Sequence, residues 1–256
     1  DIGVGAREIG YLYGMYKQIA NRDEGVLTGK GMTFGGSCGR TEATGHGVVY
    51  FANAMLKHAG EVLKGKRVVV SGSGNVALYT VRKLLEEGSV VLTLSDRGGY
   101  LYKQEGLSVA DIGTIESDKK TGQSLAEINI EGSTYAEGKA WQTIKADLYF
   151  PCATQNEINK ADAEAIVAHG AIAVVEGANM PTDAEAFEVF KEAKLLFGPA
   201  KAANAGGVAV SGLEMAQNAG HIAWECAVVD ERLREIMKQI HWQCVEFGTK
   251  EDGSVD

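Results

Sequence analysis

The chain has 256 residues, enough for one large domain or two small ones, and 25 Lys and Arg stand against 34 Asp and Glu, a formal net charge of −9. This acidic balance argues against a nucleic-acid-binding surface and against a basic membrane-binding patch. No run approaches the roughly 18 to 20 apolar residues of a membrane-spanning helix, and the first residues lack the pattern of a secretion signal. We therefore expect a soluble, cytoplasmic protein that binds neither nucleic acid nor membrane.

The cysteines and histidines do not form the patterns of a metal site. Cys38, Cys152, Cys226 and Cys244 are scattered, so we expect reduced, partly buried thiols and no disulfide framework. None of the five histidines has Cys, Asp or Glu at metal-ligand spacing. We therefore expect no metal.

Apolar residues at helical spacing predict helices over 9–19 and 48–56, on either side of a glycine-rich stretch, and a long last helix over 222–240. Between them, short apolar segments alternate with amphipathic ones. The predicted strands are 68–70, 90–95, 146–150, 171–175 and 195–198, and the predicted helices are 77–85, 161–167 and a segment through Phe187 and Phe190, with Thr182 and Glu185 as its capping box. Residues 98–146 are polar and weakly periodic, so they give no clear prediction of helix or strand.

This alternation predicts an α/β fold with a doubly wound parallel sheet, because strands that are apolar throughout must be covered on both faces. We expect three parts: 1–34, the end of a second domain and an interdomain segment; 35–205, a dinucleotide-binding domain; and 206–256, helices that return between the domains.

A glycine-rich turn follows the first predicted strand. It consists of Gly72, Ser73, Gly74, Asn75 and Val76, with Ala77 at the start of the next helix. A Gly-x-Gly-x-x-Ala turn between strand and helix lets backbone N–H groups approach a pyrophosphate. Asp96 ends the second strand 22 residues after Gly74, where an acidic residue would meet a ribose. The pattern predicts a dinucleotide site, and the alternative is a turn that binds nothing.

The three prolines, Pro151, Pro181 and Pro199, each lie at or just past the end of a predicted strand. In a parallel sheet the carboxyl ends of the strands meet at one edge, so their loops converge. These loops carry neutral side chains suited to a nicotinamide amide and riboses: Thr154, Gln155, Asn156, Asn179 and Asn204. The alternative is that each satisfies its own turn.

Nearly the whole chain, apart from about 100–145, resembles the glutamate dehydrogenases of the bacterial hexameric type, in the superfamily of glutamate, leucine, phenylalanine and valine dehydrogenases. The resemblance rests on DIGVGAREIGY, VLTGK, FGGS, EATGHG, SGSGNVA, PCATQNEI, EGANMPT and PAKAANAGGVAVSGLEMAQN. It implies NAD(P)-dependent, reversible oxidative deamination of L-glutamate to 2-oxoglutarate and ammonia by a homohexamer.

The resemblance also implies roles for individual residues. Asp1 would exchange protons with the substrate nitrogen, Thr44 and Asn75 would contact the cofactor, and Asn179 and Asn204 would lie near the nicotinamide. Arg40, Asn204, Val208 and Ser211 would bind substrate, with Ser211 against the distal carboxylate of glutamate. Relatives that act on branched or aromatic amino acids have an apolar pocket there, which favours glutamate.

Two departures keep alternatives open. Thr41 stands where the family usually has proline. The family's catalytic lysine and its carboxylate-binding lysine would lie upstream of Asp1, so we expect this chain to be a fragment without them. The alternatives are a dehydrogenase of an apolar amino acid and a non-catalytic nucleotide-binding module.

Two arguments about whether the dinucleotide is NAD or NADP point in opposite directions. Asp96 favours NAD, because a carboxylate accepts from a free 2′-hydroxyl and repels a 2′-phosphate. NADP-dependent members of the family, however, often carry the Ser95-Asp96 pair and offset it with cations, here Arg97 and Lys119 or Lys120. We predict NADP, with NAD as the alternative; ordinary surface charges are the alternative for the three cations.

Overall fold

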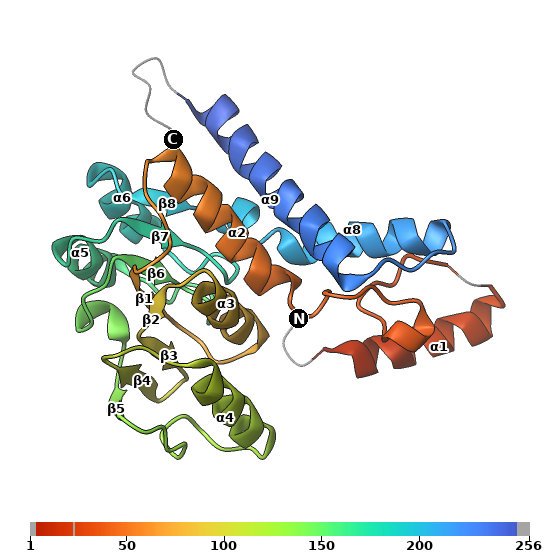
Figure 1. The fold of residues 1–256 in the computed structure, drawn as a ribbon, viewed down its shortest axis with the longest axis horizontal. Helices are drawn as coiled ribbons and strands as arrows, with labels where there is room; N and C mark the ends of the chain where they lie inside the picture. The colour runs from red at the N-terminus through yellow and green to blue at the C-terminus, as the bar shows by residue number, and fades with distance from the viewer. Residues whose placement is uncertain (1–3, 23, 250–256) are drawn as a thin grey trace.

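The computed structural model describes residues 4–22 and 24–249 (Figure 1). The first half contains α1 (Ala6–Ala20), the 3-10 helix η1 (Met32–Phe34), α2 (Ala43–His58), β1 (Arg67–Val70), α3 (Asn75–Glu86), β2 (Val90–Val91), β3 (Thr93–Ser95), β4 (Gly99–Lys103) and α4 (Val109–Lys120). The second half contains β5 (Ser133–Glu137), the 3-10 helix η2 (Ala140–Gln142), β6 (Leu148–Phe150), α5 (Lys160–Ala168), β7 (Ala173–Val175), α6 (Ala184–Glu192), β8 (Leu196–Gly198), α7 (Ala200–Ala203), α8 (Gly206–Ala219) and α9 (Cys226–Gly248).

Five strands form a parallel sheet in the order β2-β1-β6-β7-β8. The predicted doubly wound α/β fold is confirmed. The chain leaves β1 toward β2 on one side and later returns to β6 on the other side, so the strand order reverses at β1. In open parallel sheets this reversal is where ligands bind.

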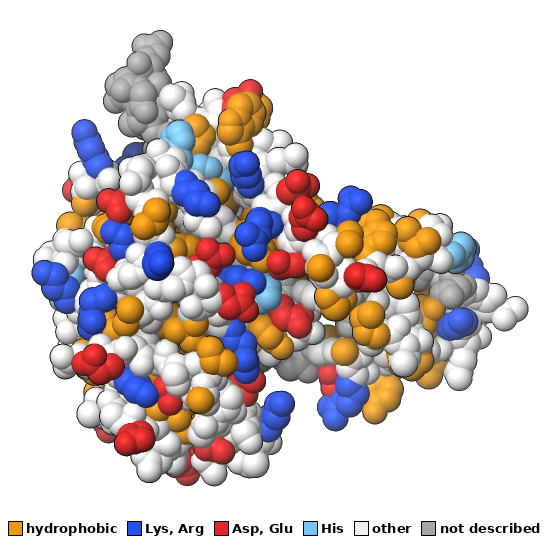
Figure 2. All heavy atoms as spheres, viewed as in Figure 1, with side chains coloured by type: hydrophobic (Ala, Val, Ile, Leu, Met, Phe, Trp, Pro, Cys, Tyr) orange, Lys and Arg blue, Asp and Glu red, His pale blue; other side chains and the backbone are white. Residues whose placement is uncertain are grey.

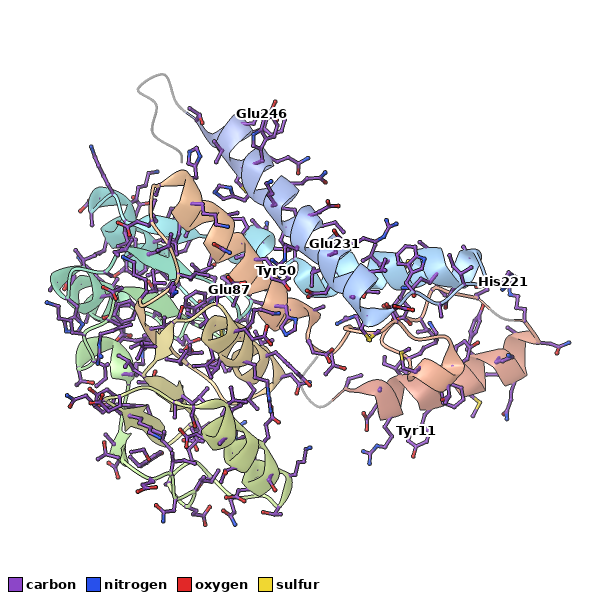
Figure 3. All side chains as sticks on the ribbon, viewed as in Figure 1. Tyr11, Tyr50, Glu87, His221, Glu231 and Glu246 are labelled. Atoms are coloured by element: carbon purple, nitrogen blue, oxygen red, sulfur yellow. A yellow bond between two sulfur atoms is a disulfide. The ribbon has the colours of Figure 1, made fainter. Side chains whose placement is uncertain are left out.

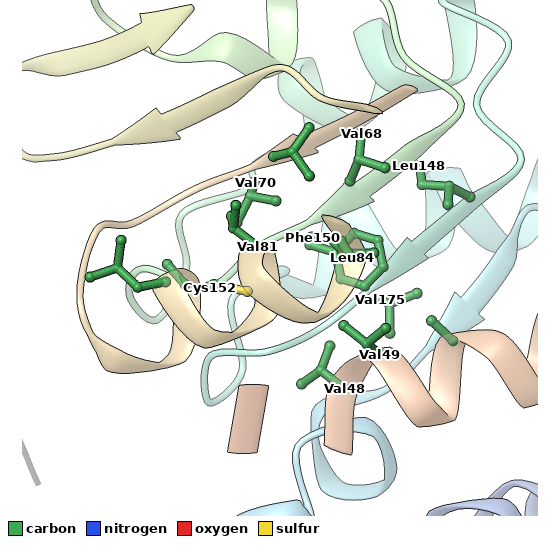
Figure 4. Close-up of a cluster of buried hydrophobic side chains, with 14 of the residues drawn as sticks. Val48, Val49, Val68, Val70, Val81, Leu84, Leu148, Phe150, Cys152 and Val175 are labelled. Carbon is green, nitrogen blue, oxygen red and sulfur yellow. The ribbon is translucent and has the colours of Figure 1, made fainter. Parts of the chain in front are cut away.

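Alternate residues of each strand face opposite cores. Val68 and Val70 of β1 pack with α2 and α3 (Figure 4), whereas Val69 packs on the other face with α5 and α6. All three valines are fully buried. Each therefore contributes roughly 1.5 to 3 kcal/mol of transfer free energy, and the two covered faces explain why these strands are apolar throughout.

The predicted strand 90–95 divides at Leu92, which is a difference from the sequence prediction. The N–H of Leu92 donates to Val68 in the parallel sheet, and its C=O accepts from Lys103 in β4. β3 joins β4 and β5 in a separate antiparallel sheet, and these last two strands lie in the segment that had no clear period. The strand therefore changes partners because one residue bonds to both sheets.

Two helix starts also differ from the predictions. Asp183, not Thr182, caps α6, since its side chain accepts from the N–H of Ala186 at 2.8 Å. The last helix begins at Cys226 and not at Ile222, which is exposed. Within α9, Val229, Leu233 and Met237 are buried.

The prediction of four reduced cysteines is wrong for one pair. Cys38 and Cys226 form a disulfide, whereas Cys152 and Cys244 are free. The pairing of Cys38 with Cys226 was not predicted, because 188 positions separate them in the sequence. In the described ranges, no helix is long and apolar enough to cross a membrane.

The lobe that holds α1 and α8 exposes apolar side chains (Figure 2). On α1 the predicted helix is confirmed, but Leu12 and Ile19 of its predicted apolar face are 56% and 78% exposed. Tyr13 is the buried residue of this helix. Leu12 and Ile19 are thus left largely uncovered by the described part of this chain.

Candidate functional site

The glycine turn lies at the reversal of strand order, between β1 and the residues after β6. Gly72 has a φ of +83°, and a Cβ on it would lie 2.9 Å from the carbonyl oxygen of Cys152. Its N–H donates to the Ser95 hydroxyl at 2.8 Å, and the N–H of Ser95 donates back to its carbonyl. Only glycine suits this backbone, and Ser95 fixes the turn.

After this turn, the start of α3 is exposed to solvent. Gly74 is the N-cap and offers no capping side chain, and both Gly74 and Asn75 are exposed. A Cβ on Gly74 would meet no described atom within 4 Å. The first N–H groups of a helix lack intrahelical partners and carry its positive end. The strand, turn and helix therefore fit the pyrophosphate of a dinucleotide.

The loops after β6, β7 and β8 converge at this edge, as predicted. The N–H of Asn156 donates to the Met180 carbonyl at 3.0 Å, so the first two loops pair. Asn204 donates from Nδ2 to Oδ1 of Asn179 at 2.8 Å, which joins the second loop to the third. Pro151 and Pro199 directly follow β6 and β8, but Pro181 lies six residues past β7. Thr154 and Gln155 are exposed beside them.

Glu176, which was not predicted from the sequence, holds these loops in place. Its buried carboxylate accepts from the N–H of Ala200 at 2.7 Å and from the N–H of Thr182 at 3.2 Å. Burial raises the pKa of Glu176, although these hydrogen bonds act in the opposite direction. A lone acidic residue directly after an apolar strand was the available signal.

The predicted substrate residues meet at α8. Arg40 donates from Nε to the Ser211 hydroxyl at 2.9 Å, and Thr28 donates to the same oxygen at 3.0 Å. A Cβ on Gly207 would lie 2.5 Å from Oγ1 of Thr44, so Thr44 borders the first turn of this helix. Val208 is 78% exposed there.

The two groups of residues are continuous along the chain. Asn204 follows α7 directly and precedes α8 by two residues. A Cβ on Gly177 would lie 3.3 Å from the Val76 side chain, so the loop after β7 also touches the glycine turn. One surface thus runs from the start of α3 through Asn179 and Asn204 to Ser211.

A buried ion pair that was not predicted supports the substrate end. Lys30 and Glu214 lie 2.6 Å apart with 1% and 0% of their side chains exposed, and Glu214 also accepts from the N–H of Gly29 at 2.9 Å. The pair holds Thr28 beside Ser211. The available signal was that Glu214 is the sole charged residue of α8.

The Asp96 carboxylate accepts hydrogen bonds from nearby groups of the protein. It accepts from the N–H of Leu125 at 2.8 Å, the N–H of Gly98 at 3.0 Å and the Tyr135 hydroxyl at 3.1 Å. Burial raises the pKa of Asp96, but these hydrogen bonds outweigh burial and lower it, so the group is ionised. Because Leu125 follows α4, the segment after this helix returns to Asp96.

The cations predicted to offset the charge of Asp96 form no ion pairs within the described residues. Arg97 and Lys120 are exposed and Lys119 is partly exposed, the two lysines lying in the last turn of α4. None of the three forms an ion pair with another described residue. The predicted catalytic Asp1 lies outside the described residues.

A cavity of about 450 Å³ opens at the opposite edge of the sheet. Arg67, Lys145, Asp147 and His169 are among the residues that line it. They lie at the amino ends of strands and the end of α5, so this cavity is separate from the candidate site. Across residues 4–22 and 24–249, no group of three His, Cys, Asp or Glu could hold a metal ion.

Comparisons with known proteins agree with this geometry. The model of the Glutamate/Leucine/Phenylalanine/Valine dehydrogenase family matches residues 35–255. The NAD(P)-specific glutamate dehydrogenase of Xylanibacter ruminicola is 50% identical over 258 residues, which cover 100% of this chain and 58% of that protein. The NADP-specific glutamate dehydrogenase of Escherichia coli is 49% identical, over 97% of this chain and 56% of its own length.

Among solved structures, the glutamate dehydrogenase of Plasmodium falciparum superposes with a TM-score of 0.95 at 45% identity, covering 98% of this chain and 55% of that one. The chain therefore spans a little over half the length of the relatives that it matches. The resemblance stated from the motifs is confirmed.

Proposed function

Because the chain belongs to the Glutamate/Leucine/Phenylalanine/Valine dehydrogenase family, we propose that the complete protein catalyses the reversible NAD(P)-dependent oxidative deamination of L-glutamate to 2-oxoglutarate and ammonia. The observation that carries the proposal is the surface from the start of α3 to Ser211. It holds a pyrophosphate-binding turn, neutral amides and an Arg-Ser pair in one continuous line.

The dinucleotide would bind along the first part of this surface. The turn from Gly72 to Val76 would hold the pyrophosphate, and Thr44, Thr154, Gln155, Asn179 and Asn204 would hold the nicotinamide and its ribose. When bound, the dinucleotide supplies the hydride acceptor. The protein's residues hold the reacting carbons in contact, and orientation alone can lower such a barrier by several kcal/mol.

Ser211 supports glutamate as the substrate. Its oxygen already accepts from Arg40 and Thr28, so its hydrogen is left to donate. A hydroxyl that must donate suits a carboxylate and would lose its partner against an apolar side chain. Arg40 and Val208 would border the same substrate, and Asp1 would exchange protons with its nitrogen. The catalytic lysine would come from another part of the complete protein.

We infer that NADP is the preferred dinucleotide. The hydrogen bonds to Asp96 turn its oxygens toward its own loop, which leaves them less able to accept from a ribose hydroxyl. Asp96 stays ionised, so a 2′-phosphate needs cations to offset it. Arg97 and Lys119 have no competing ion pair in the described chain, and each charge-assisted bond is worth roughly 1.5 to 3 kcal/mol.

Comparing kcat/KM for the two dinucleotides in the complete enzyme tests this inference. We expect NADP to be preferred about tenfold or more, and the pair Lys119→Ala/Lys120→Ala to lower that ratio about tenfold, since one lost charge-assisted bond has this effect. Lys160→Ala, an exposed lysine at the start of α5, is the matched control. A clear preference for NAD, or a ratio that the lysine pair leaves unmoved, would overturn it.

The assembly and location belong to the same proposal. We propose a homohexamer in the cytoplasm, and the uncovered apolar face of α1 supports an assembly because such faces mark interfaces. One similar structure, from Thermus thermophilus, is described as a hetero-hexameric glutamate dehydrogenase. The other candidates are a dehydrogenase of an apolar amino acid and a non-catalytic nucleotide-binding module.

A further inference from the structure

We propose that Cys38 and Cys226 form a reversible dithiol–disulfide pair. The bond fixes the substrate-binding segment, residues 37–40, to α9, and small thiols open it. The bond joins the loop before α2 to the first residue of α9, 188 positions away (Figure 3). It is the one disulfide among the described cysteines, because Cys152 and Cys244 are free.

The disulfide lies within the segment that presents Arg40. Ser37 accepts a hydrogen bond from Gln217 of α8 at 2.8 Å, and Arg40 donates to Ser211 of the same helix at 2.9 Å. Cys38 stands between these two contacts and adds a third, covalent one, to α9. The segment is thus attached to α8 by hydrogen bonds and to α9 by the sulfur–sulfur bond.

Gln217 keeps the two cysteines adjacent when the bond is open. Its buried side chain donates to Ser37, the neighbour of Cys38, and accepts from the N–H of Trp224 at 2.9 Å, two residues before Cys226. Both chain segments are therefore held by one side chain. Two thiols kept together in this way re-form a disulfide as an intramolecular step, which favours reversibility.

The pair is accessible to a reductant. Cys226 is exposed and Cys38 is half-buried. A thiolate of a small thiol attacks one sulfur, the sulfur–sulfur bond breaks, and a second thiol releases the mixed disulfide. The reductant becomes a disulfide, and both cysteines end as protonated thiols. A small disulfide oxidant reverses each step. Exposed disulfides are the ones that react in this manner.

Opening the bond removes the covalent contact between the Arg40 segment and α9. This consequence rests on the proposed function, in which Arg40 contacts the amino acid. We expect reduction to raise KM for the amino acid about threefold and to raise KM for the dinucleotide less, because Arg40 lies two residues from Cys38, whereas most of the proposed dinucleotide residues lie in other segments of the chain.

Thiol alkylation and mass spectrometry of the complete protein test the chemistry. In glutathione disulfide, the peptides of Cys38 and Cys226 are expected to be linked; in reduced glutathione, both are expected to be alkylated in the folded protein. Reduction is expected to lower the Tm by at least about 2 °C, since the bond closes a long loop.

The double variant Cys38→Ser/Cys226→Ser is expected to lose the response of the Tm to reductant, whereas Cys244→Ser, a free cysteine on α9, is expected to keep it. Free thiols in the oxidant, a linked pair that resists reduction, or a response that survives in the double variant would refute the pair. A linked, reducible pair with unchanged amino-acid KM would refute the fixing of the substrate segment. The alkylation and Tm results do not depend on which substrate the enzyme uses.

Discussion

At the scale of single residues, the buried pair of Lys30 and Glu214 holds the substrate end of the site. Removing two charges from water is costly, so such a pair contributes specificity more than stability. Here it positions Thr28 and Gly29 against α8, because Glu214 bonds to Lys30 with one oxygen and to the N–H of Gly29 with the other. Losing one partner leaves the other charge buried alone.

Glu214→Gln is therefore expected to lower the free energy of unfolding by about 3 to 5 kcal/mol. Glu61→Gln, which removes the exposed partner of Lys66, is the matched control and is expected to cost about 0 to 1 kcal/mol. Urea unfolding of the complete protein measures both. Equal losses would show that burial of the Lys30 pair has no special effect.

Residues in consecutive segments, or at strand ends that must meet at one edge of a parallel sheet, could be predicted, whereas isolated long-range pairs could not. The turn from Gly72 to Val76 follows from spacing alone, since strand, turn and helix are consecutive. Lys30 and Glu214 are 184 positions apart, and the two bonded cysteines are 188 apart. No local pattern reports such pairings.

At the scale of elements, glycines set how closely α2 approaches α8. A Cβ on Gly206 would lie 2.1 Å from the carbonyl oxygen of Ala43, and a Cβ on Gly47 would lie 2.7 Å from the Cα of Gly206. The helix that carries Ser211 therefore meets the helix that carries Thr44 at a contact between backbones.

Gly206→Ala is expected to force these helices apart and to destabilise the protein by about 1 to 3 kcal/mol or more. Gly113→Ala in α4 is the control. Its Cβ meets no described atom within 4 Å, so alanine is expected to stabilise by about 0.5 to 1 kcal/mol through helix propensity. Opposite signs of the Tm shift are predicted; the same sign for both would contradict the packing argument.

A histidine contact joins α2 to α9. The rings of His58 and His241 lie 5.8 Å apart, and Phe51 packs against His241 at 5.4 Å. Burial and the neighbouring His58 lower the pKa of His241. As pH falls through the unfolded value of about 6.5, the unfolded chain binds a proton that the folded chain does not, so stability is lost.

The effect of His241→Gln on the Tm is therefore expected to depend on pH. The Tm of the wild type minus that of the variant should decrease between pH 7 and pH 5, because only the wild type loses this contribution. Differential scanning calorimetry at several pH values measures it. A difference that stays constant over this range would contradict the assignment.

Helices and strands could be predicted where the spacing of apolar residues was clear, but the pairing of the strands could not. The spacing of apolar residues correctly placed the strands of the parallel sheet and the helices that cover it. It could not show that Leu92 bonds to two sheets, because residues 90–95 are continuous and extended, and nothing in their spacing marks a change of partner. The polar segment after Asp96 lacks a consistent period, which hid α4 and β5.

At the scale of the whole molecule, the parallel sheet lies on one side and the lobe of α1 and α8 on the other (Figure 1), and the proposed binding surface draws residues from both. The sheet supplies the turn at Gly72, and the lobe supplies Arg40 and Ser211. The uncovered apolar face of α1 belongs to the same lobe. Nothing in the spacing of this helix separates a face that packs within the chain from one that remains exposed.

The proposed substrate is the central claim, and Ser211 is the residue on which it depends most. The most direct test is kcat/KM of the complete protein for L-glutamate, L-leucine and L-phenylalanine with the preferred dinucleotide. A site built to hydrogen-bond a carboxylate rejects apolar analogues strongly, so we expect glutamate to be favoured by about 100-fold or more. Equal or higher kcat/KM for leucine or phenylalanine, or no oxidation of glutamate, would contradict the account.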